Sequence, residues 1–241
     1  MSVANDPGHS EKDPGLQKYP EFSEEDPGFP EKAKIYHVLL ASLFVLLALQ
    51  PYAHVAGGIF VQLGFAGLLL AGLAAVASRR RLFVVGLILG VPAVALLFVS
   101  GRIPTVAGGV LAIATLIIIS FVILHRILKH PVVTSGTVSA GLVVYLILGV
   151  IWAKAYWLVE HFRPDSFTGL SGTADIVVER DLFYYSYVTL ATLGYGDISP
   201  VSPQARSLAI TEAIIGQLYL VVMVAGLVGL SLTQRQRRPD Q

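Results

Sequence analysis

Residues Thr189 to Asp197 read TLATLGYGD, and the organisation of the whole chain follows from this stretch. Its two glycines, Gly194 and Gly196, alternate with larger residues. Glycine reaches left-handed backbone angles without steric cost, so a strand that alternates ordinary and left-handed residues can turn consecutive carbonyl groups toward one axis. A row of such carbonyl oxygens can replace the water around a cation. The stretch therefore predicts an ion-coordinating strand.

The predicted ligands of the ion are backbone carbonyl oxygens. We expect the strand from Thr192 through Leu193, Gly194 and Tyr195 to Gly196 to form the ion-binding filter, with the Thr192 hydroxyl as the innermost ring. The side chains of Leu193 and Tyr195 must then point away from the ion, into the packing behind the strand.

The run FYYSYVTLATLGYGDISP, Phe183 to Pro200, resembles the pore of tetrameric potassium channels, and Ala205 to Leu230 resembles it more weakly. The chain resembles bacterial six-helix potassium channels. Their pore module consists of an outer helix, a pore helix, a filter and an inner helix. The family pattern is TxTTxGYGD; Ala191 replaces a frequent threonine, whereas the ligand position Thr192 is intact. The resemblance implies K⁺ as the permeant ion, a homotetramer, no cofactor and no enzymatic activity.

The resemblance also implies roles for residues around the filter. Tyr184 and Tyr185 align with the family's aromatic cuff and, with Thr189, would support the filter; the alternative is that the tyrosines are simply interfacial. Asp197 would lie at the outer mouth and attract cations. Val188 stands where some relatives carry a buried glutamate.

The resemblance places Gly216 at the hinge of the inner helix; the alternative is a packing glycine. Gln217, Leu220 and Val224 recur at i, i+3 and i+7 and share one face of that helix, so they would line the cavity below the filter.

Composition points to a membrane protein. The 241-residue chain has a mean hydropathy of +0.69, only 14% charged residues and a net charge of +1. The charge gives no nucleic-acid signature, and the absence of cysteine excludes thiolate chemistry. The expected partners are a lipid bilayer and further copies of the chain; no small-molecule substrate is indicated.

The apolar segments predict an all-α membrane protein with six transmembrane helices plus a re-entrant pore helix and selectivity filter. A helix needs about 20 residues to cross the hydrocarbon core. Non-helical backbone at that depth is tolerated only where protein or water surrounds it. The expected spans are about Ile35–Gln50, Ala53–Ser78, Leu82–Ser100, Ile103–Leu128, Thr134–His161 and Ser202–Thr233.

Four regions are expected along the chain. Residues 1–34, with three Asp-Pro-Gly turns, predict a disordered cytoplasmic tail. Residues 35–130 form a four-helix transmembrane region without voltage-sensor charges, because residues 106–124 contain no Lys or Arg. Residues 131–234 form the pore module, and 235–241 a short basic cytoplasmic tail.

Basic residues predict the orientation. Arg79–Arg81, Arg126, Lys129 and the arginines at 235–238 fall on one side of a six-crossing chain. Lys and Arg are enriched in cytoplasmic loops. We therefore expect a multi-pass protein of the plasma membrane or the bacterial inner membrane. Both termini would lie in the cytoplasm, and Asp197 would face outward.

Two charged residues lie within the pore-module spans. Lys154 and Glu212 are expected at similar depth on adjacent helices, which predicts an ion pair behind the pore. The alternative is that Lys154 snorkels to the interface and Glu212 bonds to the pore helix. The pore helix is expected from about Asp181 to Ala191, with Asp181 at its N-terminus.

The main prediction is passive, potassium-selective conduction without classical voltage gating. The alternatives are a cation channel of relaxed selectivity, a non-conducting regulatory subunit, and a subunit of a coupled potassium transporter. The transporter is disfavoured because such proteins carry four degenerate filter repeats, and this chain has one.

Overall fold

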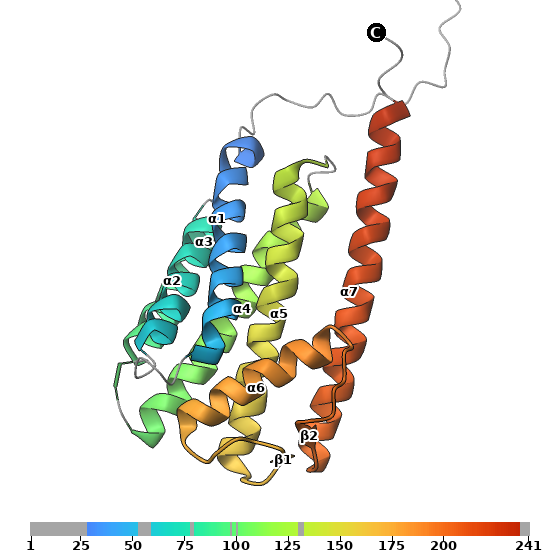
Figure 1. The fold of residues 1–241 in the computed structure, drawn as a ribbon. Coiled ribbons are helices and arrows are strands. Elements are labelled where there is room, and N and C mark those ends of the chain that lie inside the picture. The colour runs from blue at the N-terminus through green and yellow to red at the C-terminus, as the bar shows by residue number, and fades with distance from the viewer. Residues whose placement is uncertain are drawn as a thin grey trace, which may run out of the picture.

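The computed structural model describes most of the chain as helices (Figure 1). The described residues are 28–52, 59–77, 80–96, 98–99, 101–129 and 133–236. Most of the predicted disordered tail (residues 1–27) and most of the basic tail (237–241) lie outside them. Residues 28–34, which were predicted to be disordered, are helical. The elements are α1 (Gly28–Leu49), η1 (Gln50–Tyr52), α2 (Ile59–Val76), α3 (Arg80–Leu96), α4 (Arg102–Lys129), α5 (Ser135–Phe162), β1 (Phe167–Thr168), α6 (Asp175–Leu190), β2 (Ser199–Pro200) and α7 (Pro203–Gln236).

Three of these helices contain segments long and apolar enough to cross a membrane. They are Thr105–Lys129 in α4, Ser135–Phe162 in α5 and Pro203–Leu230 in α7. The apolar parts of α1, α2 and α3 are shorter, at 10–17 residues. Composition and helix length together support the expectation of a helical membrane protein.

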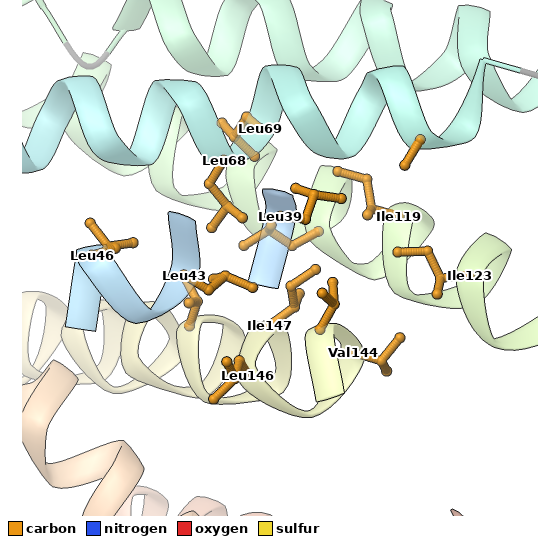
Figure 2. Packing of buried hydrophobic residues seen from close by; sticks show 14 of the residues in the cluster. Leu39, Leu43, Leu46, Leu68, Leu69, Ile119, Ile123, Val144, Leu146 and Ile147 are labelled. Carbon is orange, nitrogen blue, oxygen red and sulfur yellow. The ribbon is translucent and has the colours of Figure 1, made fainter. Parts of the chain in front are cut away.

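The core of the first four helices continues onto α5. Leu39 and Leu43 of α1 point toward Leu69 of α2, Ile119 of α4 and Ile147 of α5, and all five are buried (Figure 2). α1 therefore packs on α5 and joins the N-terminal helices to the rest of the chain.

Residues 103–124 of α4 contain no lysine, arginine or histidine. Arg126 lies in the last turn of α4 and its Nη1 donates a hydrogen bond to the Tyr36 hydroxyl at 3.1 Å. This contact ties the end of α4 to α1 and gives Arg126 a structural partner.

The starts of α5 and α7 carry recognisable capping signals. The Thr134 hydroxyl accepts the Thr137 N–H, and Thr137 in turn accepts the Thr134 N–H, which is a reciprocal capping box. α7 begins with Pro203 at its first position, and the Ser202 hydroxyl accepts the Ala205 N–H at 3.2 Å. Both helix starts were expected to within a residue.

The start of α6 was predicted wrongly. The helix begins at Asp175 rather than at Asp181, and Asp181 is a buried residue in its middle. Asp181 accepts the Ser171 N–H at 2.6 Å and pairs with Arg180 at 2.8 Å, so it anchors the preceding loop to the side of the helix. A carboxylate commonly accepts hydrogen bonds from the N–H groups of a helix N-terminus. The Asp181 carboxylate instead accepts the Ser171 N–H of the loop.

The sequence analysis also did not predict a short β-ladder of two residues in each strand. β1 pairs antiparallel with β2, with Phe167 opposite Pro200 and Thr168 opposite Ser199. In Figure 1 this ladder lies beside the lower end of α7, near the loop that follows α6. It joins the loop before α6 to the segment after Asp197.

Candidate functional site

The strand that follows α6 has alternating backbone conformations. Thr192, Gly194 and Gly196 have φ of 56°, 59° and 78°, whereas Leu193 and Tyr195 have ordinary negative φ. An alternation of this kind turns successive carbonyl groups to the same side. The two glycines adopt the left-handed angles without cost. Thr192 does so at a cost of about 1–2 kcal/mol, which was not foreseen because only glycines signal this conformation in a sequence.

The last turn of α6 holds the beginning of this strand. The N–H groups of Thr192 and Leu193 donate to the carbonyls of Thr189 and Val188, each at 2.9 Å. Val188 itself is buried. Thr189 thus contacts the strand through its backbone, and the strand leaves the helix in a fixed direction.

The far end of the strand is held by Tyr184 and by the loop before α6. The Tyr184 hydroxyl donates to Asp197 Oδ2 at 2.8 Å. Gly169 has φ of 86°, and a Cβ there would lie 1.9 Å from the Asp197 carbonyl oxygen. Only glycine allows this approach, so Gly169 is a supporting residue that the sequence did not reveal.

The hydrogen bond from Tyr184 lowers the pKa of the exposed Asp197 carboxyl below its usual value. A lowered folded-state pKa keeps the carboxylate charged through the whole range above about pH 4. The stabilisation from this bond is then present above the ordinary aspartate pKa and is lost as the pH falls through the lower, folded-state value.

We therefore predict that cation flux is insensitive to the pH on the Asp197 side between pH 8 and 5. Flux measured in vesicles with a pH step on that side should decline only below about pH 4. Asp197→Asn should reduce flux at every pH in this range. A decline with a midpoint near pH 6 would contradict the assignment of the outer charge to Asp197.

Tyr185 faces the opposite way from Tyr184 and is buried. Its ring meets Tyr156 of α5 edge-on at 5.1 Å between centroids, and Phe167 of β1 at 5.3 Å. Within one chain, Tyr185 thus supports α6 from behind. The Tyr195 side chain is 66% exposed.

The predicted Lys154–Glu212 ion pair is wrong. Lys154 Nζ pairs with Glu179 Oε1 on α6 and lies 4.8 Å from the centroid of the Phe65 ring. Glu212 is fully buried and its two oxygens lie 2.5 Å from the Tyr156 hydroxyl and the Ser186 hydroxyl. The contact with Ser186 of α6 agrees with the alternative, in which Glu212 bonds to the pore helix. Sequence reasoning failed because it compared depths and not the directions in which the side chains point.

Three tyrosines that were not predicted as site residues link α5, α6 and α7 by hydrogen bonds. Their hydroxyls donate to backbone carbonyls on other helices, at distances of 2.7–3.1 Å. The donor and acceptor pairs are Tyr145 to Leu190, Tyr187 to Leu146 and Tyr219 to Gly141. A tyrosine inside an apolar helix was the available signal, since its hydroxyl needs a partner.

Glycine at position 216 allows α7 to approach the end of α6. A Cβ there would lie 2.7 Å from Leu190 Cδ1 and 3.2 Å from the Leu190 carbonyl oxygen. Gly216 is buried, whereas Gln217 and Val224 are exposed in the single chain. The contact with Leu190 therefore supports the alternative that Gly216 is a packing glycine. The hinge role of Gly216 and the cavity-lining roles of Gln217, Leu220 and Val224 stay predictions.

We predict that Gly216→Ala lowers the thermal midpoint of the purified protein, because the added methyl group must displace Leu190. Overpacking of this kind typically costs about 1–3 kcal/mol. Gly226→Ala on the same helix is the control, since nothing lies within 4 Å of its Cβ position. If Gly216→Ala changed channel opening but left the thermal midpoint unchanged, a hinge would be favoured over packing.

Comparison with known proteins places this region in context. Residues 140–232 match the family described as "Ion channel". A stretch of 83 residues is 37% identical to the inward rectifier potassium channel Kirbac3.1 of Paramagnetospirillum magnetotacticum and covers 33% of this chain and 24% of that protein. A stretch of 91 residues is 34% identical to two pore potassium channel c of Oryza sativa subsp. japonica, covering 38% and 18% of the two chains.

Two-pore potassium channel 5 of Arabidopsis thaliana is 33% identical over 91 residues, which cover 38% of this chain and 20% of that protein. The matched segments span about a quarter or less of these curated relatives. No solved structure matches the chain.

Proposed function

We propose that the protein is a potassium-selective ion channel. The match of residues 140–232 to the family described as "Ion channel" and the similarity to proteins named as potassium channels support the proposal. The observation that carries the proposal is the alternation of left-handed φ at Thr192, Gly194 and Gly196. Carbonyl oxygens on one side of such a strand replace the hydration shell of K⁺. The ion then moves down its electrochemical gradient, and no covalent step or cofactor is involved.

A closed ring of carbonyls requires four copies of this strand, so the proposed assembly is a homotetramer with cyclic symmetry. Two features of the single chain support it. Residues 191–197 are exposed, including Leu193 and Tyr195, whose side chains are 56% and 66% exposed in the described part of the chain. The apolar segment of α7 is only 6% buried, against 67% for α5. Neighbouring subunits would cover part of both surfaces.

The proposed membrane arrangement has six crossings, α1 to α5 and α7, with α6 re-entering from the outer side. α6 crosses between α5 and α7 at an angle to both in Figure 1, as a re-entrant helix must. Its C-terminal end leads directly into the filter, so its partial negative charge faces the permeating cation. The basic residues near the C-terminal ends of α4 and α7 support an orientation with both termini in the cytoplasm.

The gate and the cavity are assigned to α7. Gln217, Leu220 and Val224 would line the cavity below the filter, and opening would move the part of α7 beyond Gly216. The described part of α4 carries its basic residues only near its two ends, so gating by a charged α4 is not proposed. α1 to α4 would act as a scaffold that holds α5.

Reversal potential tests the proposal. Purified protein in a planar bilayer, with potassium on one side and sodium on the other, should give a current that reverses near the potassium equilibrium potential. Its mass in detergent should correspond to four copies of the 25.8 kDa chain. A robust current reversing near zero would mean relaxed selectivity. A folded tetramer silent at all voltages would favour a non-conducting subunit.

A further inference from the structure

A cavity of about 470 Å³ lies between the N-terminal helices and the pore module. Gln50 of η1 and Phe65 of α2 line one side of it. Lys154 and Trp157 of α5 line another, together with residues from the first two turns of α6. Its volume is in the range of small-molecule sites. Its walls combine apolar side chains with six polar ones, from Gln50, Gln62, Thr105, Lys154, Asp175 and Glu179. None of its residues belongs to the filter.

The charged groups of the cavity are unequal in number. Lys154 is 8% exposed and forms an ion pair with Glu179 of α6. Asp175, at the start of α6, adds a second carboxylate, which His161 Nδ1 approaches only to 3.8 Å. Among the described lining residues, two carboxylates thus accompany one lysine ammonium, although the Asp175 side chain is 69% exposed and therefore weakened by solvent. Glu179, which is less exposed, is the main acceptor for a further positive charge.

An acceptor in the wall has no donor. Gln50 is 5% exposed, and its Oε1 has no hydrogen-bond partner within the described part of the chain. A buried acceptor without a donor destabilises the protein, so such a group commonly marks a missing partner. The partner that this wall lacks is an N–H or O–H donor.

We propose that the cavity binds an organic cation that carries a primary ammonium group on a small apolar body. The ammonium would donate to Gln50 Oε1 and to the carboxylates of Glu179 and Asp175. The apolar body would pack against Phe65 and Trp157, whose side chains line the cavity. The ligand would contact α6, the helix that leads into the filter. Its source is either a free amine or the headgroup of phosphatidylethanolamine.

Trp157 reports on occupancy of the cavity, because it lines the wall and the chain has only one other tryptophan, Trp152. The full-length Trp152→Phe protein in phosphatidylcholine nanodiscs would be titrated with cyclohexylammonium, and cyclohexanol would serve as the neutral control. We expect a saturable change in fluorescence with the amine alone. An equal response to cyclohexanol would overturn the proposal, since it would indicate partition into apolar space. The readout is independent of whether the pore conducts.

Two variants in the same background test the ligands. Gln50→Leu removes the unpartnered acceptor, and the double variant Lys154→Met with Glu179→Gln removes the ion pair without leaving one charge unpaired. Each should weaken amine binding at least tenfold. Phe44→Leu, on an exposed face of α1, should leave it unchanged. Unchanged affinity in both cavity variants would overturn the proposal.

The lipid arm separates the two sources. Phosphatidylethanolamine nanodiscs supply a primary ammonium, whereas phosphatidylcholine carries a quaternary one without N–H donors. A several-fold lower apparent affinity for cyclohexylammonium in phosphatidylethanolamine would assign the site to the lipid headgroup. Equal affinity in both lipids would assign it to a free amine. No binding in either lipid would overturn the proposal.

Discussion

Gly194→Ala is expected to eliminate potassium-selective current. Gly194 has φ of 59°, and nothing lies within 4 Å of the position where its Cβ would be. The effect therefore comes from backbone conformation and not from a steric clash. An L-residue in the left-handed region costs about 1–2 kcal/mol, or about 4–8 kcal/mol over four subunits. Relaxation of that strain rotates the carbonyl groups out of the ring.

The measurement is the reversal potential in planar bilayers with potassium and sodium on opposite sides. Gly67→Ala is the matched control, because its Cβ also meets nothing within 4 Å and its backbone is ordinary α-helix. The control should keep both the current and the reversal potential. Thr192 shows that one L-residue is tolerated in the left-handed region of this strand. If Gly194→Ala kept full selectivity, the carbonyl geometry proposed for the filter would be wrong.

Glu212→Leu is expected to destabilise the assembled protein by about 1–3 kcal/mol per chain. The carboxyl lies between hydroxyls on two other helices: Oε2 accepts from Tyr156 of α5, and Oε1 lies 2.5 Å from Ser186 Oγ on α6. Leucine leaves the buried Tyr156 hydroxyl without this acceptor, at about 1–3 kcal/mol, whereas the Ser186 hydroxyl keeps the Gly149 carbonyl oxygen at 2.8 Å. The three helices of the pore module lose their common polar contact.

The hydrogen positions around Ser186 refine this prediction. Ser186 Oγ lies 2.8 Å from the Gly149 carbonyl oxygen as well as 2.5 Å from Glu212 Oε1, and a serine hydroxyl has one proton. If that proton goes to Gly149, the Glu212 carboxyl must itself donate to Ser186. Glutamine offers the same pattern, with a carbonyl that accepts from Tyr156 and an amide that donates to Ser186.

We therefore expect Glu212→Gln to keep a thermal midpoint close to that of the native protein, while Glu212→Leu lowers it. The midpoint is measured on the purified protein in detergent. Thr211→Ala, next to Glu212 on the exposed side of α7, controls for changes in the helix itself. If Glu212→Gln proved as destabilising as Glu212→Leu, a negative charge rather than the hydrogen-bond pattern would be required at this position.

Much of the fold could be predicted because its signals are local. The long apolar runs predicted α4, α5 and α7 to within a few residues. The structure adds that Thr134 and Ser202 cap the starts of α5 and α7. α6 was harder because ten of its sixteen residues are polar or aromatic, and its first turns resemble a loop. The pairing of β1 with β2 was not predicted because two residues carry no periodic pattern.

In the site, the two glycines of GYG predicted two of the three left-handed residues, because conformational freedom belongs to the residue type. Only the tertiary structure decided the partners of the charged residues. Lys154 and Glu212 were predicted to lie at similar depth, yet Lys154 pairs with Glu179 while Glu212 lies against Tyr156 and Ser186. The left-handed conformation of Gly169 goes with its close approach to the Asp197 backbone. That of Thr192 goes with the hydrogen bond from its N–H to the Thr189 carbonyl. A side chain's direction depends on the rotation of its helix against its neighbours, which packing sets and a single sequence does not encode locally.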